Sequence, residues 1–203
     1  MIFKHKMLLI AATALVVAAC ATAPFKTTWR APEEGSFAIA GQKIAALYVS
    51  DVEATRRNAE EAMADEITAR GGKGIAAYSI LDSESGQDRA KAFELFRQAG
   101  IEKAMVMRAA VREREAFRPY PWVGSRFGSY WGSYGWGWGV VYDPAYGYPE
   151  TVVSLETRLY DVTKDRLMWA AVSQSRNPSD VVGLVRKLAG EALIQMEKEG
   201  LAY

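Results

Sequence analysis

The first half of the chain alternates apolar runs with amphipathic stretches. Residues 43–50 and 74–81 are mostly apolar and bounded by turn residues, which is typical of buried strands. Between them, the capping-box spacing from Ser50 to Glu53 begins a helix that runs to Arg70. The apolar positions of this helix share one face: Ala59, Ala62, Met63 and Ile67. The pattern predicts a strand, a helix ended by two glycines, and a second strand.

A second amphipathic helix and a third strand follow a polar loop. The helix ends at Gly100, and its apolar residues again keep helical spacing: Ala92, Leu95, Phe96 and Ala99. Residues 103–115 begin fully apolar and then alternate, as in a strand whose far end leaves the core. Because strands and helices alternate in this half, we expect parallel strands joined by right-handed crossovers.

The second half of the chain has the periodicity of strands instead. Residues 151–162 and 166–175 alternate apolar and polar positions around a short turn, which predicts an antiparallel hairpin with one buried face. Trp169 falls on the apolar side of its strand, so we expect it in the core. Asp161 and Asp165 flank the turn, and their position indicates a role in the turn rather than metal binding.

An amphipathic helix closes the chain. The cluster Asn177-Pro178-Ser179-Asp180 is typical of a helix start, and Gly200 follows the last helical residue. One apolar stripe runs along this helix: Val181, Leu184, Val185, Leu188, Ala192 and Met196. The predicted fold class is therefore α/β (α+β), a mixed sheet with strand-helix-strand-helix-strand first, then an antiparallel hairpin and a C-terminal helix.

A stretch rich in glycine and aromatic residues separates the two halves. Residues 117–149, here called the aromatic tract, hold four of the six tryptophans and six of the ten tyrosines. A loop longer than about 15 residues is usually functional or disordered. Trp and Tyr rings stack on sugars and dominate protein interfaces. The candidate partner or glycan contacts are Tyr130, Trp131, Tyr134, Trp136 and Trp138. The alternative is a hairpin extension whose rings pack on their own domain.

The N-terminus has the features of a secretory signal. A basic head precedes an uncharged apolar run from Met7 to Ala19. This run is shorter than the roughly 20 residues that span a bilayer, so residues 1–19 fit a signal peptide. The tetrapeptide Val17-Ala18-Ala19-Cys20 resembles the lipobox of bacterial lipoproteins. That resemblance implies cleavage before Cys20 and its acylation. The alternative is an ordinary signal peptide with a chance cysteine at the cut.

An acylated Cys20 would make the membrane the first partner of this chain. Two or more acyl chains give stable attachment, and the lipoprotein resemblance implies three. The lipid would be a covalent anchor, not a cofactor. Ala21 and Thr22 stand where lipoproteins of the inner membrane carry an Asp. The resemblance therefore implies the outer membrane, with the protein on its periplasmic side.

Cleavage would leave 184 residues, enough for one domain with an adequate core. Residues 20–35 are expected to form the lipidated N-terminus and a linker, because two prolines and a glycine disfavour regular structure there. Phe25 and Trp29 are candidates to dock on the domain and shorten the linker. Residues 36–203 are then a single α/β domain that carries the aromatic tract.

Composition argues against several kinds of site in the mature chain. Cleavage removes the only histidine, His5, and the lipid caps the only cysteine. Without these residues the chain lacks the groups for a Ser-His-Asp triad and the usual ligands of zinc, copper or iron. The remaining 23 basic and 24 acidic side chains give a formal net charge of −1, which does not favour nucleic acid. We expect no enzyme activity, no metal and no cofactor.

Carboxylate pairs leave one hydrolytic class open, because glycosidases need only two carboxylates. Glu113 and Glu115 share one strand face, as do Glu156 and Arg158. Interleaved arginines favour a solvated ladder of charge, so a carboxylate-only hydrolase is a remote alternative.

One charged helix face is likewise predicted to be solvated. Arg56 and Arg57 lie beside Glu60 and Glu61 on the first helix, where mixed charge is typical of an exposed surface. The basic residues of the chain form no cluster.

The order of elements and several motifs resemble a family of small Gram-negative envelope lipoproteins, the domain of unknown function family 4136. The matching features are the lipobox, the aromatic tract, "LYDVTKDRLMWAA" at 159–171 and the final helix. The segment "RRNAEEAMADEITARGG" at 56–72 and the strand before it are also similar to the N-terminal domain of the translocation protein TolB. The resemblance implies the fold and an envelope location, and the family has no established catalytic residues to carry over.

These observations favour a non-enzymatic accessory or assembly factor of the outer membrane that binds another envelope protein through the aromatic tract. The alternative from another class is a module that holds peptidoglycan or lipopolysaccharide sugar on the same rings. Titration of tryptophan fluorescence with soluble glycan fragments distinguishes the two, because stacked rings change their emission when a sugar binds.

Overall fold

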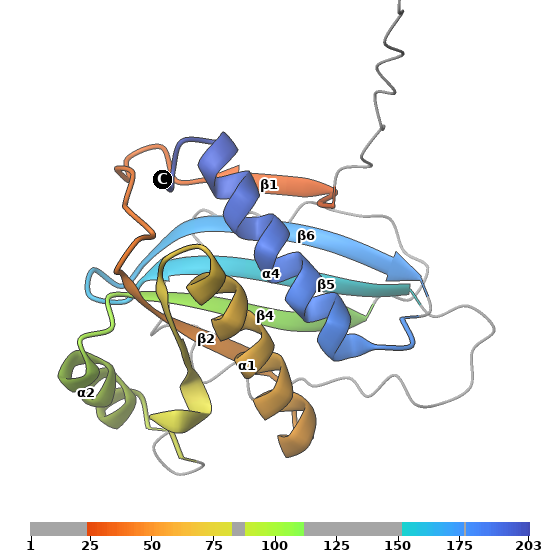
Figure 1. Cartoon of the computed structure of the whole chain (residues 1–203), viewed down its shortest axis with the longest axis horizontal. Helices are drawn as coiled ribbons and strands as arrows, with labels where there is room; N and C mark the ends of the chain where they lie inside the picture. Colours follow the sequence, from red (N-terminus) through yellow and green to blue (C-terminus); the bar gives the residue numbers. More distant parts are fainter. Residues whose placement is uncertain (1–23, 83–87, 112–151, 177) are drawn as a thin grey trace, which may run out of the picture.

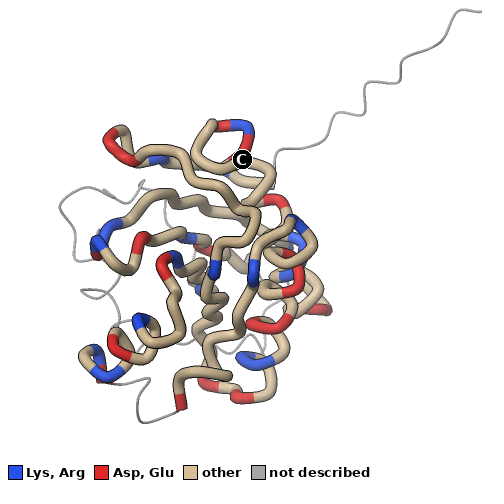
Figure 2. The backbone as a smooth tube through the Cα atoms, turned by 60° about the vertical axis from the view of Figure 1, so that its left-hand side comes forward, with Lys and Arg blue, Asp and Glu red and all other residues tan. Residues whose placement is uncertain are grey.

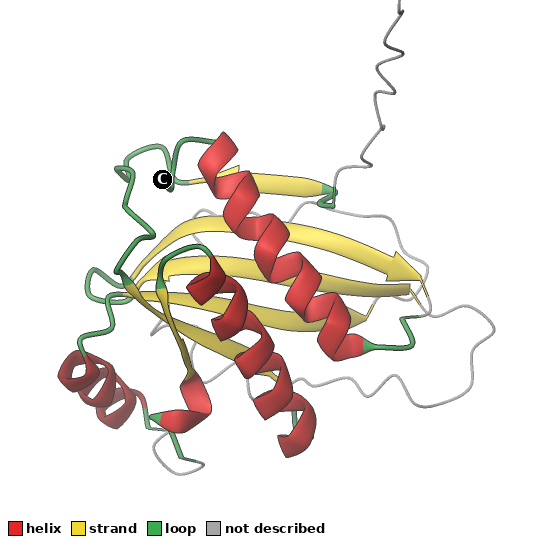
Figure 3. Ribbon diagram, viewed as in Figure 1, coloured by secondary structure: helices red, strands yellow, loops and turns green. Residues whose placement is uncertain are grey.

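The computed structural model describes residues 24–82, 88–111, 152–176 and 178–203. They form a six-stranded mixed sheet with the strand order β1-β6-β5-β4-β2-β3 (Figure 1). Helices α1 and α4 lie side by side over one face of this sheet, whereas α2 packs on the opposite face (Figure 3). The predicted α/β fold class is confirmed.

The elements have the following bounds. The strands are β1 Thr27–Arg30, β2 Lys43–Val49, β3 Lys73–Ala76, β4 Lys103–Val111, β5 Val152–Asp161 and β6 Arg166–Arg176. The helices are α1 Glu53–Ala69, the 3-10 turn η1 Ala77–Ser79, α2 Arg89–Ala99 and α4 Val181–Lys198.

The first half of the chain forms the parallel part of the sheet. β2 pairs in parallel with β3 on one side and with β4 on the other. The predicted strand at 74–81 is only half right, because β3 ends at Ala76 and η1 follows. At Gly74, an added Cβ would lie 2.0 Å from the carbonyl oxygen of Ala64, so α1 approaches β3 too closely for any side chain.

Helix boundaries follow the expected punctuation at four of five ends, including the end of α1, where Gly71 and Gly72 follow the C-cap Arg70. Asp180 caps α4 by accepting from the N–H of Gly183 at 2.8 Å. Gly100 ends α2, and Gly200 follows α4, both in the left-handed conformation. The capping box at Ser50 is wrong: the N-cap of α1 is Val52 and makes no side-chain cap bond.

The predicted hairpin is confirmed as β5 and β6, which pair antiparallel from Val152↔Arg176 to Asp161↔Arg166. Trp169 is fully buried, as expected, and its indole N–H donates to Glu199 at 2.7 Å. The expectation of a single buried face is wrong. Leu155 and Leu159 face the α1–α4 side, and Tyr160 joins the second core cluster with α2 on the other side.

The predicted linker contains a strand. β1 pairs antiparallel with β6 at the edge of the sheet, from Thr27↔Val172 to Arg30↔Trp169. The anticipated docking of Phe25 is observed: it is buried, and its ring meets Trp169 edge-on with 5.7 Å between centroids. The two prolines of this segment, Pro24 and Pro32, lie outside residues 27–30, so neither prevents this short edge strand from pairing.

The strand registers line up in one row across the sheet. Successive partners from β2 to β1 are Val49, Arg108, Glu156, Val172 and Thr27. The carboxyl end of β2 is therefore level with the start of β1. We call this end of the sheet, where β2, β4 and β6 finish and β1 and β5 begin, the tether end (Figure 1). The opposite end, which carries the β5–β6 turn at 162–165, is the turn end.

Candidate functional site

The residues predicted to carry function lie outside the described part of the chain. Cys20 precedes it, and the five aromatic candidates fall in the gap between β4 and β5: Tyr130, Trp131, Tyr134, Trp136 and Trp138. The described residues do fix where this gap opens. Val111 and Val153 are register partners on neighbouring antiparallel strands. The gap that contains the aromatic tract therefore begins and ends at the tether end of the sheet.

The same end of the sheet carries a buried carboxylate that the sequence did not reveal. Glu60, in the second turn of α1, is fully buried. Its carboxylate accepts from the N–H of Tyr78 at 2.7 Å and from the N–H of Tyr48 at 3.4 Å. The guanidinium of Arg56 lies 3.7 Å away. Glu60 thus joins α1 to β2 and to the turn after β3.

Burial dominates the electrostatics of Glu60. Removal from water disfavours the charged form and raises the pKa of Glu60 to about 7. The N–H groups of Tyr78 and Tyr48 and the guanidinium of Arg56 lower the pKa, but by less than burial raises it. A carboxyl with this pKa exchanges its proton near neutral pH. Buried ion-pair networks perturb pKa values as functional sites do, so the shift alone assigns no chemistry to Glu60.

The predicted solvated face of α1 is wrong for half of its residues. Arg56 is only 7% exposed and Glu60 is 0% exposed, and Glu60 accepts from the N–H groups of Tyr48 in β2 and Tyr78 in η1. Arg57 is exposed as expected, pairs with Glu53 at 2.6 Å and lies over the ring of Tyr78. Arg56 and Arg57 hold the pKa of Glu53 below its usual value. The sequence alone could not identify Glu60 as buried, because its burial depends on how α1 packs against β2 in the folded chain.

A second charged cluster lies on the α2 side of the sheet. Glu156 pairs with Arg158 at 2.6 Å and with Arg108 at 3.1 Å, and its side chain is 6% exposed. The ion pair between Glu156 and Arg158 confirms that the two side chains share one face of β5, but this face is buried rather than solvated. Two arginines already bind this carboxylate, which does not suit a general acid. Glu113 and Glu115 lie outside the described residues.

A third buried pair closes the turn end. Asp161 is 2% exposed and lies 2.9 Å from the ammonium of Lys103. It also accepts from the hydroxyl and N–H of Thr163 and from the N–H of Lys164. Burial raises the pKa of Asp161, but Thr163, Lys164 and Lys103 together outweigh it and lower the value to about 2. Asp161 thus has the turn role that the sequence indicates.

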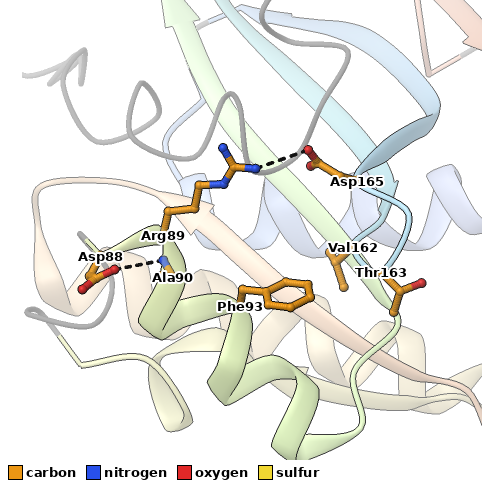
Figure 4. A pocket seen from close by; sticks show the side chains of 7 residues that line it. All are labelled: Asp88, Arg89, Ala90, Phe93, Val162, Thr163 and Asp165. Atoms are coloured by element: carbon orange, nitrogen blue, oxygen red, sulfur yellow. Dashed lines mark hydrogen bonds and ion pairs between the residues drawn. The ribbon is translucent and has the colours of Figure 1, made fainter.

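One open cavity of about 550 Å³ lies between the first turn of α2 and the β5–β6 turn (Figure 4). Phe93 points from α2 toward Val162 and Thr163, which gives the cavity an apolar wall. Arg89 reaches Asp165 at 3.6 Å across its mouth. With one cation and two carboxylates on the rim, the cavity has no charge preference that would identify a ligand class.

Acidic and basic residues are interspersed along the described part of the backbone (Figure 2). Within that part, no group of three or more His, Cys, Asp and Glu side chains could hold a metal ion. No helix of the described ranges is long and apolar enough to cross a membrane.

Comparison with known proteins gives only a loose likeness. No family model and no curated protein matches the chain. It is similar to PelC, which forms a dodecamer, from Paraburkholderia phytofirmans, at 13% identity and a TM-score of 0.44, over 82% of this chain and 94% of that chain. It is also similar to the lipoprotein GNA1162 from Neisseria meningitidis, at 16% identity and a TM-score of 0.40, over 78% and 99%. Likeness this loose supports no inference, and the resemblance to family 4136 stays a prediction.

Proposed function

We propose that the protein is a lipid-anchored, non-enzymatic accessory or assembly factor of the bacterial outer membrane. Acylated Cys20 holds it on the periplasmic side, and the aromatic tract binds another envelope protein. The lipobox-like sequence and the signal peptide support the anchor. The proposal treats the α/β domain as a rigid base, since its paired strands and two helix-covered faces hold the attachment points of the tract in place.

The attachment of the tract is the observation that carries this proposal. β4 and β5 pair over nine residue pairs, from Lys103↔Asp161 to Val111↔Val153. Two neighbouring antiparallel strands need only a two-residue turn. This chain instead inserts a long segment with four tryptophans at that point. Binding loops on a rigid scaffold are a common arrangement for recognition, because the scaffold limits the entropy that the loop loses on binding.

Deletion of residues 120–148 tests this proposal in cells. We expect an affinity-tagged deletion protein to reach the membrane and fold but to lose the envelope protein that the intact chain recovers. A matched control replaces Tyr203 by Ala, because Tyr203 is an exposed aromatic residue, 73% accessible, on the described domain. Unchanged partner recovery by the deletion protein would contradict the proposal.

A glycan is the second candidate ligand, because successive Trp and Tyr rings separated by glycines also suit sugar stacking. Soluble peptidoglycan fragments and lipopolysaccharide core oligosaccharide would then shift the tryptophan emission of the purified chain. Trp131, Trp136 and Trp138 are the rings expected to respond. No emission change at millimolar glycan would leave the protein-binding proposal as the one to pursue.

A further inference from the structure

The N-terminal edge strand fixes where a lipid anchor can reach. β1 continues past Thr27 through Lys26, whose N–H donates to the carbonyl of Val172 at 2.7 Å. Phe25 is 7% exposed and packs edge-on against the fully buried Trp169. The chain is therefore held to the domain from Phe25 onward, and only residues 21–24 separate it from Cys20.

Those few residues form a very short tether. Four Cα–Cα steps from Cys20 to Pro24 span at most about 14 Å when fully extended. The fifteen-residue linker expected from sequence would have reached roughly 50 Å. Because an acylated Cys20 must lie at the bilayer surface, Pro24 is confined to the zone directly above the lipid headgroups.

The strand register determines which other parts of the domain lie near the lipid headgroups together with Pro24. The row from Val49 to Thr27 places the start of β1 level with the end of β2. α1 begins four residues after Val49, and α4 begins five residues after the end of β6 at Arg176. The N-terminal turns of both long helices therefore lie at the same end of the sheet as the start of β1, as Figure 1 shows.

We propose that the tether end of the domain rests against the lipid headgroups of the membrane, while the turn end points away from it. This inference depends on the proposed acylation of Cys20. Exposed residues at the tether end mix charges of both signs with an aliphatic side chain; they include Lys26, Asp51, Val52, Glu53, Arg176 and Asp180. Lys26 and Arg176 suit lipid phosphates, and Val52 is 47% exposed.

The two ends of β6 provide matched positions for a test. Arg176 ends the strand at the tether end, and Lys164 lies two residues before its start at the turn end. Both side chains are exposed. Eleven residues of extended strand separate these ends by about 35 Å. Because the only native cysteine carries lipid, R176C and K164C each provide a single thiol for a fluorescent label.

The experiment uses the full lipidated protein in vesicles of phosphatidylethanolamine and phosphatidylglycerol that contain a nitroxide-headgroup lipid. We expect the label at R176C to lose most of its fluorescence and the label at K164C to lose little. A flexible insert of about 12 Gly and Ser residues after Thr22, adding roughly 20 Å of reach, should restore the R176C signal. Folding of each variant is checked by its near-ultraviolet circular dichroism.

The outcomes separate this orientation from the anchor itself. Equal quenching at the two positions, or stronger quenching at K164C, in protein that floats with the vesicles would overturn the orientation and leave the anchor intact. Failure of the native chain to float with vesicles would overturn the anchor and, with it, the orientation. Loss of flotation in Cys20→Ser alone would support the anchor on which the orientation depends.

Discussion

A buried carboxylate lies at each end of the sheet, and the pKa values of the two are shifted in opposite directions. At the turn end, Asp161 is 2% exposed, yet its pKa is lowered to about 2. At the tether end, Glu60 is 0% exposed, and its pKa is raised to about 7. Both side chains are inaccessible to solvent, but Glu60 lies deeper in the protein, and Asp161 also has more donors. Asp161 has an ammonium at 2.9 Å, a hydroxyl and two N–H groups, whereas Glu60 has two N–H groups and a guanidinium only at 3.7 Å.

Burial raises the free energy of a charged carboxylate, and its hydrogen-bond and ion-pair partners determine whether it stays charged. The turn end is built from satisfied charges around a tight turn, which suits a purely structural role. The tether end instead holds a carboxyl that gains a proton near neutral pH. It also carries both attachment points of the aromatic tract and the start of the docked N-terminal segment.

The largest expected effect breaks the ion pair at the turn end. Asp161→Asn keeps an oxygen for Thr163 and Lys164 but leaves the ammonium of Lys103, 9% exposed, without its counter-charge. Removal of one partner of a buried pair typically costs about 4 kcal/mol in the free energy of unfolding. Urea denaturation at pH 7 measures the loss.

A double-mutant cycle controls that measurement. Lys103→Met with Asp161→Asn removes both charges, so the double variant should be more stable than Asp161→Asn alone. Additive losses in the cycle would mean that the two groups do not interact, contrary to their 2.9 Å separation.

The next effect tests the docking of the N-terminal segment at the tether end. Phe25→Ala removes a buried ring from the main core cluster and its edge-on contact with Trp169. We expect a loss of about 3 kcal/mol in the free energy of unfolding, as for other buried Phe→Ala changes. Tyr203→Ala, at an exposed position, is the matched control and should change stability little. A loss as small for Phe25→Ala would contradict the docked segment.

A pH titration of stability sharpens the comparison of the two carboxylates. The pKa of Glu60 is about 7 in the folded chain against a usual 4.5, so the folded state binds the proton more tightly. Its stabilising contribution is fully present below pH 4.5 and is lost as the pH rises through 7, by about 3 kcal/mol in total. The contribution of Asp161 has the opposite sign: it is present above pH 3.8 and is lost as the pH falls through 2.

Glu60→Gln isolates the neutral limb of that curve. The variant should lack the decline in unfolding free energy between pH 4.5 and 7, while its acid limb below pH 4 stays as in the native chain. A decline of equal size in Glu60→Gln would show that another group causes it.

The smallest expected effect concerns a single ring of the aromatic tract. Trp136→Ala should weaken binding of the recovered partner by about 2 kcal/mol, or roughly 30-fold in Kd, if Trp136 is a hot spot. Its effect on unfolding should be slight. Isothermal titration with the purified partner measures the change, and an unaltered Kd would remove Trp136 from the contact.

Periodicity predicted the order of elements well, because helices and strands here bury faces that follow simple repeats. The parallel core, the β5–β6 hairpin and the ends at Gly100 and Gly200 are as predicted. β1 was missed, because a four-residue edge strand leaves almost no periodic signal. Glu60 was missed since a charged residue among charged neighbours looks solvated until the crossover places it against β2.

For the predicted site, the sequence gives only the amino-acid composition of the aromatic tract and not the arrangement of its rings. Aromatic residues and glycines show that the tract has binding potential, but their spacing specifies neither a face nor a ligand. What the structure adds is the position of the described residues on either side of it, Val111 and Val153 on paired strands. Pairing between strands that are 40 residues apart depends on the whole sheet, which no local pattern encodes.

The most direct test of the central claim places a photo-crosslinking amino acid at Trp136 in living cells and identifies the adducts by mass spectrometry. The same residue placed at Tyr203, on the described domain, serves as the control position. The account predicts one dominant envelope protein at Trp136 and none at Tyr203. Absence of any adduct at Trp136, in a chain that reaches the membrane, would contradict the claim that the aromatic tract is the contact element.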